Sequence, residues 1–192
     1  MMGSHKRSLK HERGKKYYQQ TDMDIEESID IADAGIVILA PYLPRLFSML
    51  SLTENGNFKS VDARMKAIFL MRYAIGKEEE YSRSDLLLYN PLVGMKLNAT
   101  IVQAVEISDS EKEIVISMLN GVLQNWNKLK NSSIATLREA FLRRNGKLEE
   151  KEDKFYLTVE EKDFDVLIDN IPWNFKMIRM PWMEKPIIVK WR

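Results

Sequence analysis

The chain has 192 residues, of which 45% are hydrophobic and 30% charged, and its formal net charge is +1. This balance is typical of a soluble globular protein and argues against a surface built throughout for nucleic acid. The chain contains no cysteine, which excludes disulfides and thiolate metal sites, and no apolar run approaches the roughly 20 residues of a membrane-spanning helix.

The start of the chain differs from the rest in composition. Residues 1–22 are polar, basic and aperiodic, and we interpret them as a flexible basic tail. Whether residues 1–5 are native or the remnant of an expression tag stays open. Tyr17 and Tyr18 could stack on bases, but a charged chain end is more often a solvated linker, so nucleic acid is not an expected partner. We expect residues 23–192 to form a single domain.

The first ordered elements are predicted to be short. Residues 28–31 alternate polar and apolar side chains, which indicates a strand. The apolar run 34–39 is followed by Pro41 and Pro44. Because proline ends or kinks a helix, this pattern predicts two short helices, the second over residues 43–51.

The next segment contains clear turn and cap signals. Residues 54–57 predict a turn, and Ser60 is expected to cap a helix that ends near Gly76. A further short helix is predicted to begin at Ser84 and to be ended by Pro91.

The longest helix is predicted over residues 109–129, where Ser108 and Glu111 form a capping box. Its apolar residues share one face at helical spacing. Another helix should begin near Ile134, with Gly146 as its C-cap.

After Gly146 the spacing of hydrophobic residues changes from the helical pattern towards every second residue, as in a strand. A hairpin is predicted from residue 147 to 159, followed by a short helix over 163–170 and two strands over 175–180 and 187–191. The predicted fold class is α+β, with a mostly helical part followed by a small antiparallel sheet near the C-terminus.

Groups with catalytic chemistry are scarce. The only histidines, His5 and His11, lie in the predicted tail, and the glycines are too widely spaced for a phosphate-binding loop. Asp163, Asp165 and Asp169 are the remaining candidates for acid–base chemistry or Mg²⁺ binding, but carboxylates on a helix are usually solvated surface charge. We expect no enzyme activity, no cofactor and no metal site.

The tryptophans near the end of the chain recur every nine residues, at Trp173, Trp182 and Trp191. Packing of the sheet against the helices is the favoured interpretation, because an indole buries a large area. An interface anchor is the alternative, since tryptophan is enriched at binding hot spots. Trp182 and Trp173 are therefore candidate interface residues.

Several segments together resemble the C-terminal region of contractile injection system tape measure proteins. They are residues 33–47 (DAGIVILAPYLPRLF), 62–64 and 70–74 (DAR, LMRYA), 86–94 (LLLYNPLVG), Trp126, 129–133 (LKNSS), 137–146 (LREAFLRRNG), 164–168 (FDVLI), 171–173 (IPW) and 180–183 (MPWM). The resemblance covers about residues 25–191; residues 95–107 fit poorly and residues 1–22 have no counterpart.

The resemblance implies a structural protein of a phage-tail-like contractile particle, in which a tape measure sets the length of tube and sheath. A wholly helical chain of this length would reach only about 290 Å, at about 1.5 Å per residue, so the chain alone is a poor ruler. The expected function is therefore a globular tape-measure domain that anchors to tube, baseplate or cap proteins.

Partners, copy number and location follow from the same resemblance. We expect a homo-oligomer in the assembly, no membrane contact, and assembly in the cytoplasm before incorporation into the particle. Arg138, which lies within a segment that carries the resemblance, is a third candidate interface residue, although an internal ion pair would explain it equally well. The alternative function is an adaptor or nucleic-acid-binding module that uses the basic tail.

Overall fold

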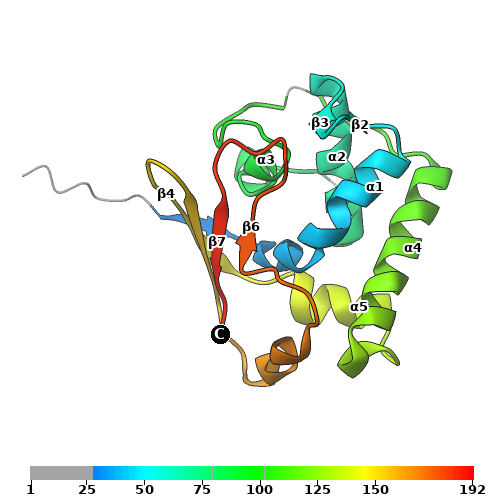
Figure 1. The fold of residues 1–192 in the computed structure, drawn as a ribbon, viewed down its shortest axis with the longest axis vertical. Coiled ribbons are helices and arrows are strands. Elements are labelled where there is room, and N and C mark those ends of the chain that lie inside the picture. The colour runs from blue at the N-terminus through cyan, green and yellow to red at the C-terminus, as the bar shows by residue number, and fades with distance from the viewer. Residues whose placement is uncertain (1–27, 79, 102) are drawn as a thin grey trace, which may run out of the picture.

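The computed structural model describes residues 28–78, 80–101 and 103–192, so the expected basic tail lies outside the described residues. A five-stranded sheet lies on one side of the molecule, and most of the helices lie on the other side (Figure 1). The strand order is β1 (Ile29–Ile31), β4 (Gly146–Glu150), β5 (Phe155–Val159), β7 (Ile187–Lys190) and β6 (Met177–Ile178).

The sheet is mixed. Neighbouring strands are antiparallel except β5 and β7, which run parallel with Phe155 opposite Ile187. The α+β class is confirmed, but the expectation of an antiparallel sheet that follows a helical part is wrong. β1 joins the sheet from the start of the described chain, and a crossover through residues 160–186 returns the chain so that β7 is parallel to β5.

The first two helices follow one another without a break. They are the 3₁₀ helix η1 (Ala34–Tyr42) and the α-helix α1 (Leu43–Met49). Pro41 lies inside η1, and Pro44 lies in the first turn of α1, where its missing N–H would have no helical partner anyway. The second predicted helix is thus confirmed, while the prolines mark a change of helix type.

A two-stranded hairpin, β2 (Thr53–Glu54) and β3 (Asn57–Phe58), confirms the predicted turn. Asn55 and Gly56 both have positive φ, as a two-residue hairpin turn of this kind requires. The helix α2 (Val61–Ala74) follows, and the Ser60 hydroxyl accepts a hydrogen bond from the Ala63 amide at 3.1 Å, which confirms the predicted cap.

The next two helices differ from the prediction. They are η2 (Arg83–Leu86) and α3 (Tyr89–Leu92). Ser82, not Ser84, is the cap, because Asp85 three residues later accepts a hydrogen bond from the Ser82 amide. Pro91 lies inside α3 instead of ending a helix.

The longest helix, α4 (Asp109–Asn125), begins with the predicted capping box between Ser108 and Glu111. It ends four residues earlier than expected, because Trp126 leaves the helical conformation as its indole enters the core. The short 3₁₀ helix η3 (Asn127–Leu129) continues the chain.

A helix of mixed type leads into the sheet. It consists of α5 (Ile134–Leu137) and the π-helical turn η4 (Arg138–Leu142). Gly146 is not its C-cap; it opens β4, where a Cβ atom would lie 2.8 Å from the Ala34 Cβ. The 3₁₀ helix η5 (Asp163–Asn170) follows β5 and lies where the sequence predicts a short helix.

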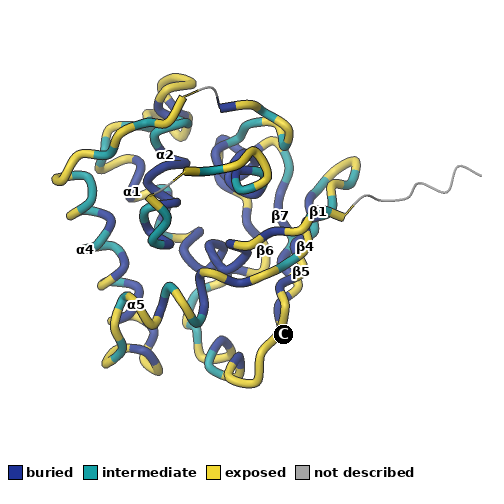
Figure 2. The backbone as a smooth tube through the Cα atoms, turned by 180° about the vertical axis from the view of Figure 1, so that it is seen from behind, coloured by how far each residue is buried: buried dark blue, intermediate teal, exposed yellow. Residues whose placement is uncertain are grey.

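The core surrounds η1, whose residues Ala34–Ala40 are all buried (Figure 2). Gly35 lets η1 approach η4 closely, since a Cβ atom there would lie only 1.7 Å from the Phe141 carbonyl oxygen. No helix among the described residues has both the length and the apolar character needed to cross a membrane.

Candidate functional site

Trp182 lies in the interior and is only 8% exposed. Its ring packs against Phe47 and Phe58, with centroid distances of 5.9 and 4.8 Å. The indole N–H donates a hydrogen bond to the Leu92 carbonyl at 2.9 Å. These contacts support packing as the role of Trp182, and its role as an interface anchor stays a prediction.

Trp173 is half-buried and connects the C-terminal segment to η1. Its indole N–H donates to the Ile38 carbonyl at 3.0 Å, and its ring makes edge contacts with Tyr42 and Trp126. Trp173 as a whole is partly accessible, whereas Trp182 is buried, and the interface role of Trp173 stays a prediction.

Arg138 binds the C-terminal end of α2. Its guanidinium donates to the carbonyls of Ala74 and Tyr73 at 2.8 and 2.9 Å, and Arg143 donates in the same way to Ile75 and Gly76 at 2.8 and 2.9 Å. The two guanidinium groups thus satisfy carbonyls at the end of the helix, where backbone donors run out, and two positive charges lie at the negative end of the helix dipole. This arrangement is an internal clamp, and the interface role of Arg138 stays a prediction.

The π-helical turn explains why two arginines five residues apart act together. In an α-helix their side chains would point about 140° apart. In η4 the Arg143 amide donates to the Arg138 carbonyl at 2.8 Å, and this wider turn brings the side chains to the same side. Gly76 leaves room for them, because a Cβ atom there would lie 2.4 Å from an Arg143 nitrogen.

The carboxylates considered for catalysis have separate environments. Asp165 is fully buried and forms a bidentate ion pair with Arg144, at 2.7 and 2.8 Å. It also accepts hydrogen bonds from the Trp191 indole and the Lys162 amide, both at 2.9 Å. Asp169 pairs with exposed Arg192 at 2.9 Å.

The electrostatics of Asp165 suit a structural ion pair. Burial by itself would raise the pKa of this carboxyl, but the hydrogen bonds from Arg144, Trp191 and Lys162 outweigh burial and hold its pKa below the usual value. The carboxylate therefore stays ionised, and its acceptor positions face protein donors. No group of acidic or histidine side chains within the described ranges could hold a metal ion.

A second buried acid joins η1 to α3. Asp33 accepts a hydrogen bond from the Tyr89 hydroxyl at 3.0 Å and forms an ion pair with Lys77 at 2.8 Å. Burial, followed by the neighbouring Asp33 charge, raises the pKa of Tyr89 well above its ordinary value. Tyr89 is therefore a neutral donor that helps to fix the start of η1.

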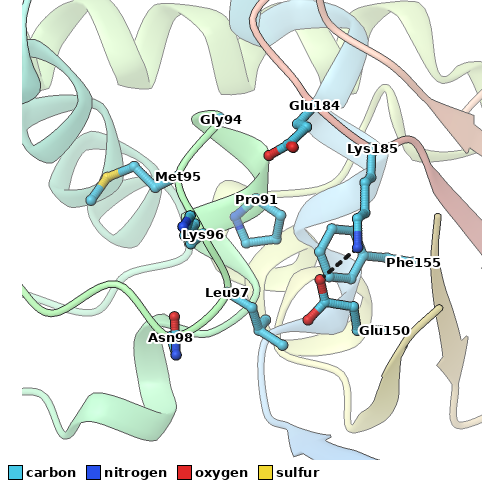
Figure 3. A pocket seen from close by; sticks show the side chains of 10 residues that line it. All are labelled: Pro91, Gly94, Met95, Lys96, Leu97, Asn98, Glu150, Phe155, Glu184 and Lys185. Carbon is cyan, nitrogen blue, oxygen red and sulfur yellow. Dashed lines mark hydrogen bonds and ion pairs between the residues drawn. The ribbon is translucent and has the colours of Figure 1, made fainter. Parts of the chain in front are cut away.

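A cleft of about 450 Å³ opens between the 94–98 loop and the sheet (Figure 3). Its floor includes Pro91 and Phe155, and Lys185 crosses one side to reach Glu150 at 2.8 Å. Apolar groups and charged groups of both signs line it.

Sequence reasoning missed a groove between α1 and α4, with a volume of about 330 Å³. Met49, which is 58% exposed, stands at its rim, and Ile114 and Met118 form part of its wall. The sequence places Ile114 and Met118 on the apolar face of α4, but it does not indicate that α1 leaves them partly uncovered, because that depends on how distant segments pack.

These features define a small α+β protein. Buried ion pairs and hydrogen bonds connect its elements, and its surface carries a cleft lined by apolar and charged residues and a mainly apolar groove. The family described as contractile injection system tape measure protein matches residues 3–191, nearly the whole chain. The chain belongs to this family and is a structural component of a contractile, phage-tail-like injection particle. No curated protein and no solved structure matches the chain.

The match also corrects one expectation. Because it begins at residue 3, the prediction that residues 1–22 have no counterpart in the family is wrong. The segments that carry the resemblance meet inside the fold: Gly35 lies against Phe141, Arg138 clamps the end of α2, and Trp182 reaches Leu92. Much of the resemblance therefore reflects the architecture, and partner-binding residues are to be sought at the surface.

Proposed function

We propose that this chain acts as a compact docking domain of the injection particle, which anchors to tube, baseplate or cap proteins and helps to set the length of tube and sheath. The observation that carries the proposal is the compact arrangement of the described elements, which are short and pack around one apolar cluster. The longest helix, α4, has 17 residues and spans about 26 Å. Pairing of Ile29 with Leu148 also brings distant parts of the chain together in one sheet.

Residues 23–192 act as one domain in this proposal, because the buried apolar side chains of the described residues form one cluster that joins helices and sheet. Several copies take part, since the tube and sheath of such particles repeat the same subunits around an axis. Assembly takes place in the cytoplasm, before the chain becomes part of the finished particle.

An insertion distinguishes a docking domain from a ruler. The turn between β4 and β5 is exposed at Glu152 and Asp153, and 42 residues of flexible Gly/Ser sequence can be inserted there. If the chain measures length in an extended form, the tube should lengthen, by up to about 140 Å for 42 fully extended residues. If it is a docking domain, tube length in electron micrographs stays unchanged. A proportional increase in length would refute the proposal.

Direct binding tests the anchoring step. The purified chain is titrated against the tube, baseplate and cap proteins of its own particle, one at a time, by calorimetry. Saturable binding to one of them, with a defined stoichiometry, is the expected result. Lack of binding to all three, with each protein shown to be folded and competent to assemble, would contradict anchoring.

A further inference from the structure

The groove between α1 and α4 has two helical walls. From α1 and the residue before it come Tyr42, Arg45, Leu46 and Met49, and from α4 come Ile114, Ser117, Met118, Gly121 and Asn125. Leu46 is buried and belongs to the floor, whereas Met49 is 58% exposed. The groove is thus an apolar trough with a flexible methionine at its rim, and methionine adapts readily to different partners.

The apolar face of α4 is wider than the core needs. Val115, Leu119 and Val122 are buried in the core. Ile114 and Met118 form a second apolar row beside them, at a spacing of four residues, and both remain partly accessible. Both side chains line the groove opposite α1, which does not cover them fully, so they leave apolar surface available for a further contact.

Gly121 continues this second row and is not explained by contacts within the chain. Glycine in the middle of a helix lowers its stability relative to alanine. A Cβ atom at Gly121 would find no atom within 4 Å, in contrast to Gly35, where the Phe141 carbonyl oxygen lies 1.7 Å away. The missing side chain leaves open space along the α4 wall of the groove, where the backbone of a partner can approach closely.

Arg45 supplies the electrostatic part of the recognition. It is the single charged side chain lining the groove, and no hydrogen bond or ion pair joins it to another residue of the described ranges. A second copy of the chain would present the same groove without a carboxylate, so two grooves face to face would leave both arginines without a counter-ion. A different surface, one that carries an acidic side chain, is complementary.

We propose that this groove binds one amphipathic α-helix of a partner protein in the particle. Apolar side chains of that helix, three or four residues apart, lie on Ile114, Met118 and Met49, its backbone passes over Gly121, and one carboxylate meets Arg45. Both walls of the groove are helices and offer no free strand edge, which favours a helix over an extended segment. The inference rests on the proposed docking function and names the surface and the kind of partner.

The test is photo-crosslinking from the rim of the groove in cells that assemble particles. The photoreactive amino acid p-benzoylphenylalanine replaces Met49 in the full chain, and the control carries it at Val61, which is 62% exposed but lies outside the groove. Mass spectrometry identifies the crosslinked residue. A crosslink to a helical segment of a particle protein, with Asp or Glu within one turn, is expected. Crosslinks only to a second copy or to a non-helical segment, or a yield no higher than at Val61, overturn the proposal.

Substitution of Gly121 separates binding from folding. Gly121→Ala should raise the Tm by about 2–4 °C, because alanine favours the helix, while it lowers the crosslink yield from position 49. Asn120→Ala is the matched control, since Asn120 is exposed on the same helix outside the groove; it should raise the Tm and leave the yield unchanged. If Gly121→Ala leaves the yield unchanged, the partner does not approach as proposed.

Charge reversal at Arg45 tests the carboxylate. Arg45→Glu should reduce the crosslink yield at least about tenfold, which corresponds to about 1.4 kcal/mol of binding, with little change in Tm. An unchanged crosslink yield would refute the proposed ion pair between Arg45 and a carboxylate of the partner helix. Calorimetric titration of the unmodified chain and these variants with the tube, baseplate and cap proteins separates the two proposals. If the unmodified chain binds one of these proteins but gives no crosslinks from the groove, the groove proposal alone is refuted. If the unmodified chain binds none of them, the docking function is refuted.

Discussion

Asp165→Asn should destabilise the protein severely, although it removes only a charge. The carboxylate accepts four hydrogen bonds, two from Arg144 and one each from Trp191 and Lys162. An asparagine side chain has one acceptor oxygen, so its amide N–H groups would face donors and the Arg144 charge would remain buried without a counter-ion. Breaking a buried ion pair in this way costs about 3–5 kcal/mol, a large share of the roughly 5–15 kcal/mol by which a domain is stable.

Asp169→Asn is the matched control on the same helix. Its ion pair with Arg192 is exposed, and such pairs contribute about 0–1 kcal/mol. Urea unfolding followed by tryptophan fluorescence measures both variants at pH 7. If Asp165→Asn costs no more than Asp169→Asn, the buried pair does not hold the fold together as the geometry indicates. Replacing both partners, Arg144→Met with Asp165→Leu, should cost less than Asp165→Asn because no buried charge is left unpaired.

The same carboxyl predicts a pH dependence. Its pKa in the folded protein is below the unfolded value of about 3.9, so the unfolded state binds the proton more readily. The stabilisation by Asp165 is therefore fully present above the unfolded-state pKa and is lost as the pH falls through the folded-state pKa. The stability difference between wild type and Asp165→Asn should shrink below about pH 4, and a constant difference down to pH 2 would contradict this assignment.

Three further variants test separate contacts. Gly35→Ala should prevent stable folding or lower the Tm by more than about 10 °C, because its Cβ atom would clash with the Phe141 carbonyl; calorimetry measures the shift. Trp182→Phe should cost about 1–3 kcal/mol in urea unfolding, since the buried Leu92 carbonyl loses its donor, and should leave self-association in sedimentation unchanged. A folded Trp182→Phe variant that no longer binds particle proteins would instead support an interface anchor. Ser108→Ala should cost about 1 kcal/mol through loss of the α4 cap, measured by thermal unfolding.

Local features of the fold were predictable from the sequence. Ser108 and Glu111 form the predicted capping box, and the Asn55-Gly56 turn lies where the sequence places it. The hairpin of β4 and β5 also follows from its alternating pattern. In each case the signal and the interaction lie within a few residues of one another, so one short segment contains both.

Long-range features could not be predicted in this way. Nothing near Ile29 indicates that its partner is Leu148, or that β7 pairs parallel to β5. The segment that begins at Arg138 has an ordinary α-helical pattern, and its π-helical turn depends on carbonyls at the end of α2, far away in the sequence. Trp182 follows Pro181, a setting that also suits an exposed anchor, yet the aromatic side chains that pack against it come from distant elements.

The position of β7 has a consequence for how the protein is made. β7 is the last strand of the described chain, yet it lies inside the sheet, between β5 and β6. On a ribosome, a nascent chain that lacks residues 187–190 would leave one edge of β5 and the inner edge of β6 without partners, and exposed strand edges promote aggregation. The sheet therefore closes only after nearly all described residues have been translated, so unfinished chains cannot present the completed fold to an assembling particle.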